Sequence, residues 1–539
     1  MQTKLATWSQ DPGFEFDDIY NLLYDEDFLS RAYRSVKHNR GSSTAGVDQE
    51  SIGDFEEDLS ENLEDLRRSL KSRSFTPKPV RRTYIPKGDG RKRPLGIPTI
   101  KDRIVQEALR MVLEPIYETH FSEYSFGFRP NRSTHDAITS VRQRMAPAVS
   151  GYKPWMIDAD ISGFFDNVDH QTLEKILRDR ITDRDVRTLI WKFLRAGVME
   201  NGEVQESMFG TPQGGIVSPL LANIYLNELD QWAARWTELT TGEKRRRRRR
   251  GKGNWHYVRY ADDFLFMTNG SKGRAEHMMG EMKRFVEEQL NLSLSDKKTS
   301  LVHAEDGLTF LGYDLKAKTE TGGVKRTVPK EAKRDIRAKV REATSGPTDI
   351  SARAKIQALN GVLRGWANYY KYATDAARVF GDVRYFTWHR VTRWLARKYR
   401  TSRSKLISRR LDSKSPISIN GATLYDLTGK SDTYGKSSTR HGHPYLDCET
   451  RRRERLPETA PWLANNEKRR GWRDVKVRAR AEDNHTCQKC GKDLSNSSAP
   501  VHHIRQRSRY DNPTEADRLE NLETLCTPCH RTKKSKLAR

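Results

Sequence analysis

Hydrophobic and polar positions follow two different periods between about residues 15 and 315. In residues 101–118, Ile104, Ala108 and Val112 recur at every fourth position with charges elsewhere, which predicts an amphipathic helix packed on a core. Short apolar runs between such helical segments predict strands. The mixture predicts one large body of α/β or α+β type.

Two of the predicted strands border or contain carboxylates. Residues 255–269 predict two strands flanking a tight turn that contains Asp262 and Asp263, and residues 155–161 predict a buried strand that contains Asp160. Adjacent carboxylates repel one another, and an acid in a buried strand is costly without a partner, so a bound cation is the natural explanation. A surface hairpin with a solvated Asp-Asp pair is the alternative.

Composition divides the rest of the chain. Residues 330–400 return to a helical pattern with many aromatic residues and arginines, which predicts a further helical domain. Residues 400–475 are rich in Ser, Lys, Arg, Gly and Pro, as is typical of a linker or a loosely folded basic module. The run from Arg245 to Arg250 predicts a loop that either binds phosphate or is simply solvated.

The overall charge indicates the kind of partner. The chain has 539 residues, enough for several domains, and its 98 Lys and Arg against 72 Asp and Glu give a formal net charge of +26. This surplus favours an acidic polymer as partner, nucleic acid above all, over a merely cationic surface. No stretch approaches the ~20 apolar residues that span a bilayer, and the N-terminus lacks the apolar core of a signal peptide. We therefore expect a soluble intracellular protein with no membrane partner.

Asp160, Asp262 and Asp263 together suit a site that holds two Mg²⁺ ions about 4 Å apart. Such a pair fits nucleotidyl transfer, because one ion activates a primer 3′-hydroxyl and the other neutralises the triphosphate and its leaving group.

Seven blocks in a fixed order resemble one family. Tyr260-Ala261-Asp262-Asp263 matches the YADD box of reverse transcriptases. The order of the blocks around it resembles the intron-encoded proteins of bacterial group II introns. The blocks occupy residues 81–106, 121–137, 155–170, 210–230, 255–269, 292–300 and 309–313. The resemblance implies an α+β right-hand polymerase with fingers, palm and helical thumb.

The resemblance also implies roles for residues around the carboxylates. Lys87 and Arg93 are expected to contact the incoming triphosphate, and Gln213 to border the nucleotide pocket. Phe165 matches the steric-gate position, where an aromatic ring excludes a ribose 2′-hydroxyl and so selects dNTPs. Lys298 could be the general acid for the leaving pyrophosphate. The residues alone also allow other roles. Lys87 and Arg93 fit solvated charges in a turn, Gln213 fits a plain turn before a helix, and Phe165 fits a core aromatic residue.

Residues 359–373 resemble the thumb, or maturase domain, that helps intron RNA fold for splicing. Arg364 and Lys371 offer positive charge to RNA, beside the rings of Trp366 and Tyr369. Because a helical aromatic stripe is usually core, we assign both rings to packing and RNA binding to the two basic residues.

Four cysteines near the C-terminus form two Cys-x-x-Cys knuckles: Cys487, Cys490, Cys526 and Cys529. Four thiolates in this arrangement predict one tetrahedral, structural Zn²⁺. Such a metal supplies folding energy that a short domain with few apolar residues lacks. Cys448 stands alone, which does not suit a secreted disulfide scaffold and favours a reducing compartment.

His502, His503, Asn521 and His530 resemble the HNH nuclease pattern within a ββα-metal fold. The resemblance implies that His503 is the general base, that His502 and His530 hold one Mg²⁺ or similar ion, and that Asn521 orients the base. A structural zinc ribbon whose histidines only contact phosphate is the alternative.

Together these resemblances imply a multifunctional group II intron protein. It would copy intron RNA by target-primed reverse transcription, assist splicing as a maturase, and nick one strand of target DNA in support of retrohoming. The implied partners are the intron RNA, double-stranded target DNA and dNTPs, and the number of copies per RNA, a dimer included, is left open. The implied location is the bacterial cytoplasm, at the nucleoid when acting on DNA. Another bacterial reverse transcriptase, such as a retron type, and an RNA chaperone with relic catalytic residues are the alternatives.

The expected domains follow the chain in order. They are fingers and palm in residues 1–320, thumb in 321–400, a basic DNA-binding or linker region in 401–475, and the HNH nuclease in 476–539.

Overall fold

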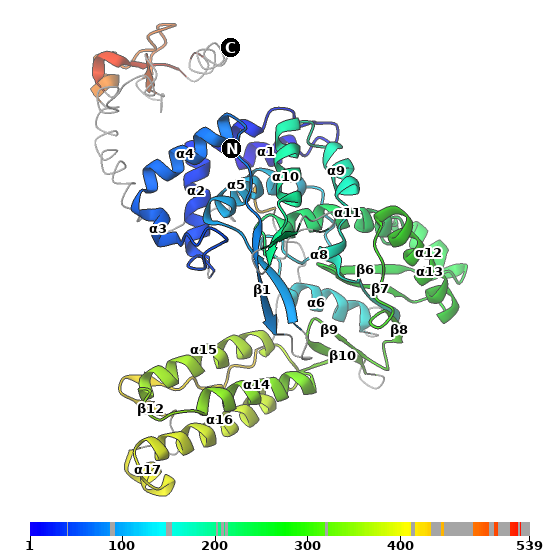
Figure 1. Cartoon of the computed structure of the whole chain (residues 1–539). Coiled ribbons are helices and arrows are strands. Elements are labelled where there is room, and N and C mark those ends of the chain that lie inside the picture. Colours follow the sequence, from blue (N-terminus) through cyan, green and yellow to red (C-terminus); the bar gives the residue numbers. More distant parts are fainter. Residues whose placement is uncertain are drawn as a thin grey trace. The chain divides into compact units, whose positions relative to one another are not determined.

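The structure is a computed structural model, and Figure 1 shows its elements. It describes residues 1–39, 41–86, 92–146, 154–200, 203–205, 210, 214–318, 322–410, 416–432, 443–446, 478–494, 501–504, 518–526 and 529. The chain forms two compact units, Met1–Thr450 and Arg451–Arg539. Helices and strands are mixed in the first unit, as the α+β prediction requires. Among the described helices, none combines the length and the apolar character needed to cross a membrane.

An antiparallel sheet lies at the centre of the palm. Its strands run in the order β6 (Trp255–Tyr260), β7 (Asp263–Thr268), β3 (Trp155–Asp160) and β8 (Ser300–His303). The strand predicted at Asp160 and the two strands predicted around Asp262 are confirmed. Because neighbouring side chains of a strand point to opposite faces, the sheet contributes to two hydrophobic cores.

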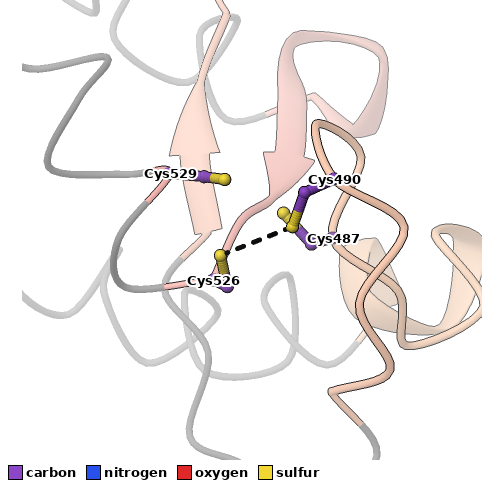
Figure 2. Close-up of side chains that lie close together, drawn as sticks. All are labelled: Cys487, Cys490, Cys526 and Cys529. Atoms are coloured by element: carbon purple, nitrogen blue, oxygen red, sulfur yellow. Dashed lines mark hydrogen bonds between the residues drawn. The ribbon is translucent and has the colours of Figure 1, made fainter.

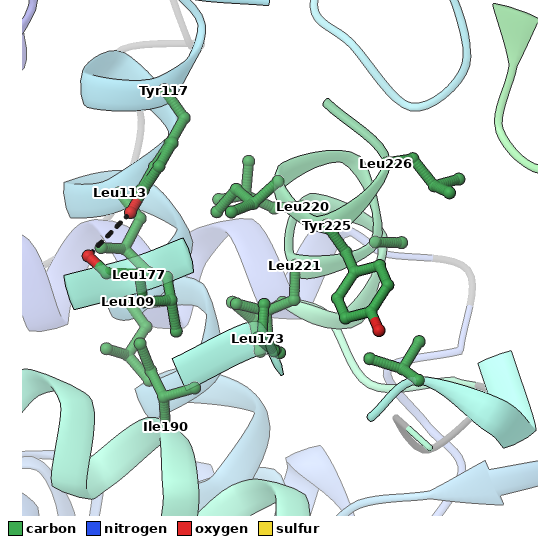
Figure 3. Packing of buried hydrophobic residues seen from close by; sticks show 14 of the residues in the cluster. Leu109, Leu113, Tyr117, Leu173, Leu177, Ile190, Leu220, Leu221, Tyr225 and Leu226 are labelled. Atoms are coloured by element: carbon green, nitrogen blue, oxygen red, sulfur yellow. Dashed lines mark hydrogen bonds between the residues drawn. The ribbon is translucent and has the colours of Figure 1, made fainter. Parts of the chain in front are cut away.

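The first core lies between the sheet and helices. Phe264 and Phe266 of β7 belong to it, and Figure 3 shows part of its packing. The phenol of Tyr117 donates to the carbonyl of Leu177 at 3.4 Å. Besides the N-terminal helices described below, this core contains α5 (Ile100–Tyr117), α8 (Phe164–Asn167), α9 (His170–Arg178), α10 (Arg184–Arg195), α11 (Ser218–Thr237) and α13 (Lys272–Leu290).

The helix predicted at residues 101–118 is confirmed as α5, but it is buried almost all round rather than on one face. Most of its charged residues are buried with partners, whereas Lys101 and Arg110 are partly exposed. Arg110 donates to Glu107 at 2.7 Å and to Glu114 at 2.7 Å, so the charges need no exposed face.

The fingers contain a hairpin and a cap of helices. Strand β1 (Val80–Pro86) pairs with β2 (Lys92–Ile97), in a sheet completed by β4 (Val198–Glu200) and β5 (Glu203–Gln205). The N-terminal helices are α1 (Gln2–Trp8), η1 (Tyr20–Tyr24), α2 (Glu26–His38), α3 (Ile52–Glu57) and α4 (Leu59–Lys71).

The second core joins the other face of the sheet to the thumb. Leu265 and Met267 of β7 belong to it, as do α6 (Thr134–Met145) and a small sheet of β9 (Leu308–Phe310), β10 (Tyr313–Ala317) and β11 (Val324–Thr327). The thumb helices are α14 (Lys330–Thr344), α15 (Ala352–Tyr370), α16 (Ala376–Lys398) and α17 (Arg403–Arg410), followed by β12 (Ser418–Ile419) and β13 (Ala422–Thr423). Leu406, Ile417 and Leu424 are buried in the same core. We therefore propose that the thumb continues past residue 400.

The prediction of a loop from Arg245 to Arg250 is wrong. Most of that run lies in helix α12 (Thr241–Arg249). The side chain of Thr240 caps the amide of Glu243, and Glu243 caps Thr240 in return. Arginine is a good helix former, so a capped start is enough to extend the helix into the charged run.

Among its described residues, the second unit has only two small hydrophobic clusters. Strand β14 (Val501–His503) pairs with β15 (Leu522–Thr524), and the short helix η4 (Leu519–Asn521) precedes β15. One of its hydrophobic clusters consists of Ala479, Val501 and Leu522, and the other surrounds the cysteines.

Candidate polymerase and nuclease sites

The three predicted carboxylates of the palm meet at one end of the sheet. Asp160 is the last residue of β3 and pairs in register with Asp263, the first residue of β7. Asp262 occupies the turn before it, and Ala261 adopts a left-handed φ of 55° to make that turn. Asp158 lies two residues before Asp160, on the same face of β3.

This cluster of acids is electrostatically strained. Burial, a hydrogen bond with Asp160 and repulsion from Asp262 raise the pKa of Asp263 to about 7. Burial and repulsion from Asp160 raise the pKa of Asp158 to about 6, and mainly burial raises that of Asp262. Without a metal ion, a proton shared between carboxylates relieves their mutual repulsion. A bound cation would relieve the same repulsion, so this set of carboxylates fits a divalent ion that prefers oxygen ligands.

Mg²⁺ binding should depend on pH, because Asp263 must lose its proton to become a ligand. Below pH 7 the proton competes with the ion, and above pH 7 the carboxylate is already free. We expect the rise in Tm produced by Mg²⁺, without nucleotide, to grow from about pH 6 to about pH 8, with apparent affinity changing by up to about tenfold per pH unit below 7. Asp263→Asn should remove the part of this dependence near pH 7 and leave the part near pH 6, where Asp158 titrates. An equal Mg²⁺ effect at all pH values would contradict the assignment.

Two basic side chains reach the carboxylates from other elements. The Lys298 ammonium donates to Asp160 Oδ2 at 2.8 Å, and this bond raises the pKa of the lysine. Its side chain is 60% exposed, so it can also meet a substrate. Arg93, on the fingers strand β2, is close enough to Asp262 for its charge to oppose the rise in that carboxyl's pKa. The structure thus brings both predicted residues to the site.

Phe165, five residues after Asp160 in the chain, contacts a second, exposed aromatic ring. It belongs to α8 and makes an edge contact with Phe128, at 6.4 Å between ring centroids. Phe128 is exposed, whereas Phe165 is half-buried, so Phe165 is neither pure core nor fully solvated. The predictions for Lys87 and Gln213 lie outside the described residues.

A buried ion pair supports the turn that contains Ala261 and Asp262, called the catalytic turn below. Arg259 Nε donates to Asp230 Oδ1 at 2.7 Å and its Nη2 to Oδ2 at 2.6 Å, and both side chains are 0% exposed. Arg259 Nη1 donates to the carbonyl of Ala261 at 3.0 Å and to Asn223 Oδ1 at 3.0 Å. The Asn223 amide in turn donates to the Gly127 carbonyl at 2.8 Å.

Gly127 completes this support. A Cβ at this position would overlap the backbone nitrogen of Ala261, so only glycine allows the close approach. Sequence reasoning missed Arg259 and Asp230 as supports, although one signal was available. An arginine within the apolar strand β6 has to find a buried carboxylate.

Arg364 and Lys371 are predicted to bind RNA; Arg364 lies within the C-terminal half of α15, and Lys371 follows its last residue. The Arg364 guanidinium is exposed and lies over the Tyr425 ring at 5.4 Å, and Lys371 lies over Tyr372 at 4.7 Å. Trp366 and Tyr369 pack against the thumb core, as predicted.

The four predicted cysteines converge in the second unit (Figure 2). Their sulfurs all lie within 4.8 Å of one another, and those of Cys490 and Cys526 are 3.7 Å apart. Burial opposes ionisation of Cys487, but backbone amides, that of Cys526 first, lower its pKa to about 6. Hydrogen bonds with the other cysteines raise the pKa of Cys529 to about 12. A cluster of four sulfurs in which the Cys487 thiol ionises readily fits a structural Zn²⁺ site.

The nuclease residues are described only in part. His502 and His503 belong to β14, opposite Glu523 and Leu522, but their side chains lie outside the described residues, as does His530. Asn521 is buried immediately before β15, and its carbonyl accepts from the amide of Ile504 at 2.7 Å. The backbone therefore brings the His502-His503 and Asn521 segments of the predicted nuclease motif together.

Three family models match separate stretches of the chain. They are the reverse transcriptase (RNA-dependent DNA polymerase) at residues 85–315, the maturase-specific domain of group II introns at 333–411, and the HNH endonuclease at 487–536. The first contains the carboxylate site, the second most of the thumb, and the third the four cysteines.

Similarity to known proteins extends over nearly the whole length. Group II intron-encoded protein LtrA of Lactococcus lactis subsp. cremoris is 30% identical over 603 aligned positions, which cover 96% of this chain and 95% of the relative. The chain belongs to the group II intron-encoded proteins. Protein YkfC of Escherichia coli is 38% identical over 360 positions, covering 63% of this chain and 94% of the relative.

This group II intron protein is a reverse transcriptase that also carries a maturase-specific domain and an HNH endonuclease domain. The predicted family and both enzyme activities are confirmed, and the retron alternative is set aside. The domains imply binding of intron RNA and use of DNA and dNTPs, and their enzyme families use metal ions.

Proposed function

We propose that this group II intron protein moves its intron by retrohoming: it nicks one strand of a target DNA and extends the new 3′-hydroxyl by copying the intron RNA. The observation that carries the proposal is the presence, in one chain, of a clustered carboxylate turn and a four-cysteine nuclease unit. A chain that both cuts and polymerises can use its own product as a primer.

In the polymerase reaction, Asp160, Asp262 and Asp263 would hold two Mg²⁺ ions, which when bound activate the primer hydroxyl and neutralise the triphosphate. Arg93 binds the triphosphate from the fingers, a role that Lys87 shares. Lys298 is charged at neutral pH and lies at the carboxylates, so it can donate a proton to the leaving pyrophosphate.

Nucleotide choice depends on the wall of the pocket. The Phe165 ring stands against the 2′ position of the incoming sugar, braced by Phe128, and so selects dNTPs. Gln213 borders the same pocket. Its neighbour Gly214 supports this placement, because a Cβ at Gly214 would overlap the carbonyl of Gly96 on β2, which puts this block against the fingers.

In the nuclease, Cys487, Cys490, Cys526 and Cys529 would hold a structural Zn²⁺ that fixes the fold. His503 takes the proton from the attacking water, His502 and His530 bind the nuclease Mg²⁺, and Asn521 orients the base. Arg364 and Lys371 bind intron RNA through its phosphates, with one or two protein copies on each RNA.

A zinc-ligand variant tests the order of these steps. Because the described residues of the nuclease unit form only small apolar clusters, Cys526→Ser should unfold it while the first unit keeps its own core. We expect ribonucleoprotein with this variant to lose at least about 100-fold in nicking of intact target DNA and in cDNA joined to that strand. The measurement is cDNA covalently attached to labelled target.

A pre-nicked target serves as the control. Both proteins should prime from it equally, because the 3′-hydroxyl is supplied. Failure of the variant on pre-nicked DNA would contradict the division into two independent units. Nicking at wild-type rate would contradict the zinc assignment.

A further inference from the structure

The arginine-rich helix α12 is anchored on the palm. Arg247 Nε donates to the Gly253 carbonyl at 3.0 Å, and its guanidinium lies over the Trp236 ring at 5.7 Å. The amides of Gly251 and Lys252 close the helix by donating to the carbonyls of Arg248 and Arg247. The run of charge therefore has a fixed position next to the sheet, unlike a mobile arm.

This helix carries positive charge that its own sequence does not balance. Lys244 and Arg248 repel one another at i, i+4, and Arg245 and Arg249 do the same. Glu243 is the one acid within α12, and its carboxylate is used by the cap at Thr240. A bound anion relieves the repulsion and stabilises the helix.

One side of α12 opens into a cavity of about 220 Å³. Lys244 and Arg248 line it from α12, Arg144 from the last turn of α6, and Asn254 and His256 from the start of β6. No carboxylate is among the described residues of its lining. Three cations from two helices around one open cavity make a site for an anion.

The β6 side of the cavity is polar and has no counter-charge among the residues that the structure describes. Burial, with Arg144 and Lys244 nearby, lowers the pKa of His256 to about 3, so its ring is neutral. Asn254 is buried, and its side-chain oxygen has no hydrogen-bond partner among the described residues. A buried acceptor of this kind is costly unless a donor reaches it. The 2′-hydroxyl of a ribose supplies such a donor on the sugar next to a phosphate, and DNA lacks this hydroxyl.

The cavity lies away from the catalytic turn. Asn254 and His256 flank the start of β6, whereas Asp262 follows its end. Six strand residues separate the two places by roughly 20 Å at ~3.3 Å per residue. A strand bound in the cavity is therefore not the primer terminus at the carboxylates.

We propose that Arg144, Lys244 and Arg248 form a second RNA-binding site, which holds a phosphodiester of single-stranded RNA while Asn254 accepts from the adjoining ribose 2′-hydroxyl. Naming the intron RNA as the ligand rests on the proposed function. The chemistry of the site itself rests on the cavity alone.

The test compares two pairs of basic residues on the same protein. Arg144→Gln with Arg248→Gln removes two charges from the cavity, and Arg245→Gln with Arg249→Gln removes two charges from α12 that do not line it. We expect the cavity pair to raise the Kd for intron RNA at least about tenfold and to reduce the salt slope by about two. The control pair should raise Kd less than about threefold. Thermal unfolding checks that each variant is folded.

Asn254→Ala tests the contact with the sugar. It should weaken binding of RNA but not of single-stranded DNA of the same sequence, since only RNA carries the 2′-hydroxyl. Equal losses from the two charge pairs would overturn the site in favour of a diffuse basic surface, and equal losses for RNA and DNA would overturn the ribose contact. If intron RNA binds no tighter than unrelated RNA of equal length, the intron RNA is not the specific ligand and the proposed function is contradicted. The comparison of the two charge pairs, made on unrelated RNA, still tests whether the cavity binds RNA.

Discussion

Asp262→Ala should reduce primer extension on an RNA template by at least about 1,000-fold, because losing a metal ligand removes several kcal/mol of transition-state stabilisation. Burial in the fold already disfavours the charge of Asp262. Its removal should therefore leave Tm and RNA binding unchanged. The measurement is dNTP incorporation by purified protein with Mg²⁺.

Asp296→Ala is the matched control. Asp296 lies two residues before Lys298, but its side chain is 91% exposed and it belongs to no predicted site. Its variant should extend primers at the wild-type rate. Full activity of Asp262→Ala would contradict the carboxylate site. Wild-type protein that splices RNA but fails to extend any primer would instead favour an RNA chaperone with relic catalytic residues.

Arg259→Ala should have the second-largest effect. It leaves Asp230 buried and unpaired, which costs the first unit about 3–5 kcal/mol of unfolding free energy. It also removes the donor to the Ala261 carbonyl, so the catalytic turn loses its support. We expect a lower Tm together with a loss of primer extension of at least about tenfold.

A double variant separates these two effects. Arg259→Met with Asp230→Leu replaces both buried charges by apolar side chains of similar size, which should restore most of the stability. It does not restore the donor to Ala261, so kcat should stay low while KM for dNTP changes little. Recovery of kcat along with Tm would show that Arg259 supports only the fold.

The sequence predicted the site well where chemistry and strand pattern coincide. Acids at the ends of apolar strands predicted both where Asp160 and Asp263 lie and that they are close together. The same pattern could not show that Arg259 reaches Asp230, because β6 and α11 meet only in the folded palm. A pair of this kind leaves no periodic signal along the chain.

Helix α12 shows the opposite limit. Charge density predicted a loop at Arg245–Arg250, whereas local capping and arginine's helix propensity determined a helix. The anion site proposed beside this helix also needs Arg144, which lies about a hundred residues earlier in the chain. The sequence gives no reason to connect Arg144 with the charged helix.

The support of the catalytic turn is distributed along the chain. Gly127, Asn223 and Asp230 precede α12, whereas Arg259 and Ala261 follow it. If the protein were divided into two fragments at α12, neither fragment alone would contain a braced turn. Activity would then depend on reassembly, so the helix marks a natural place for a split enzyme whose polymerase is switched on by bringing its halves together.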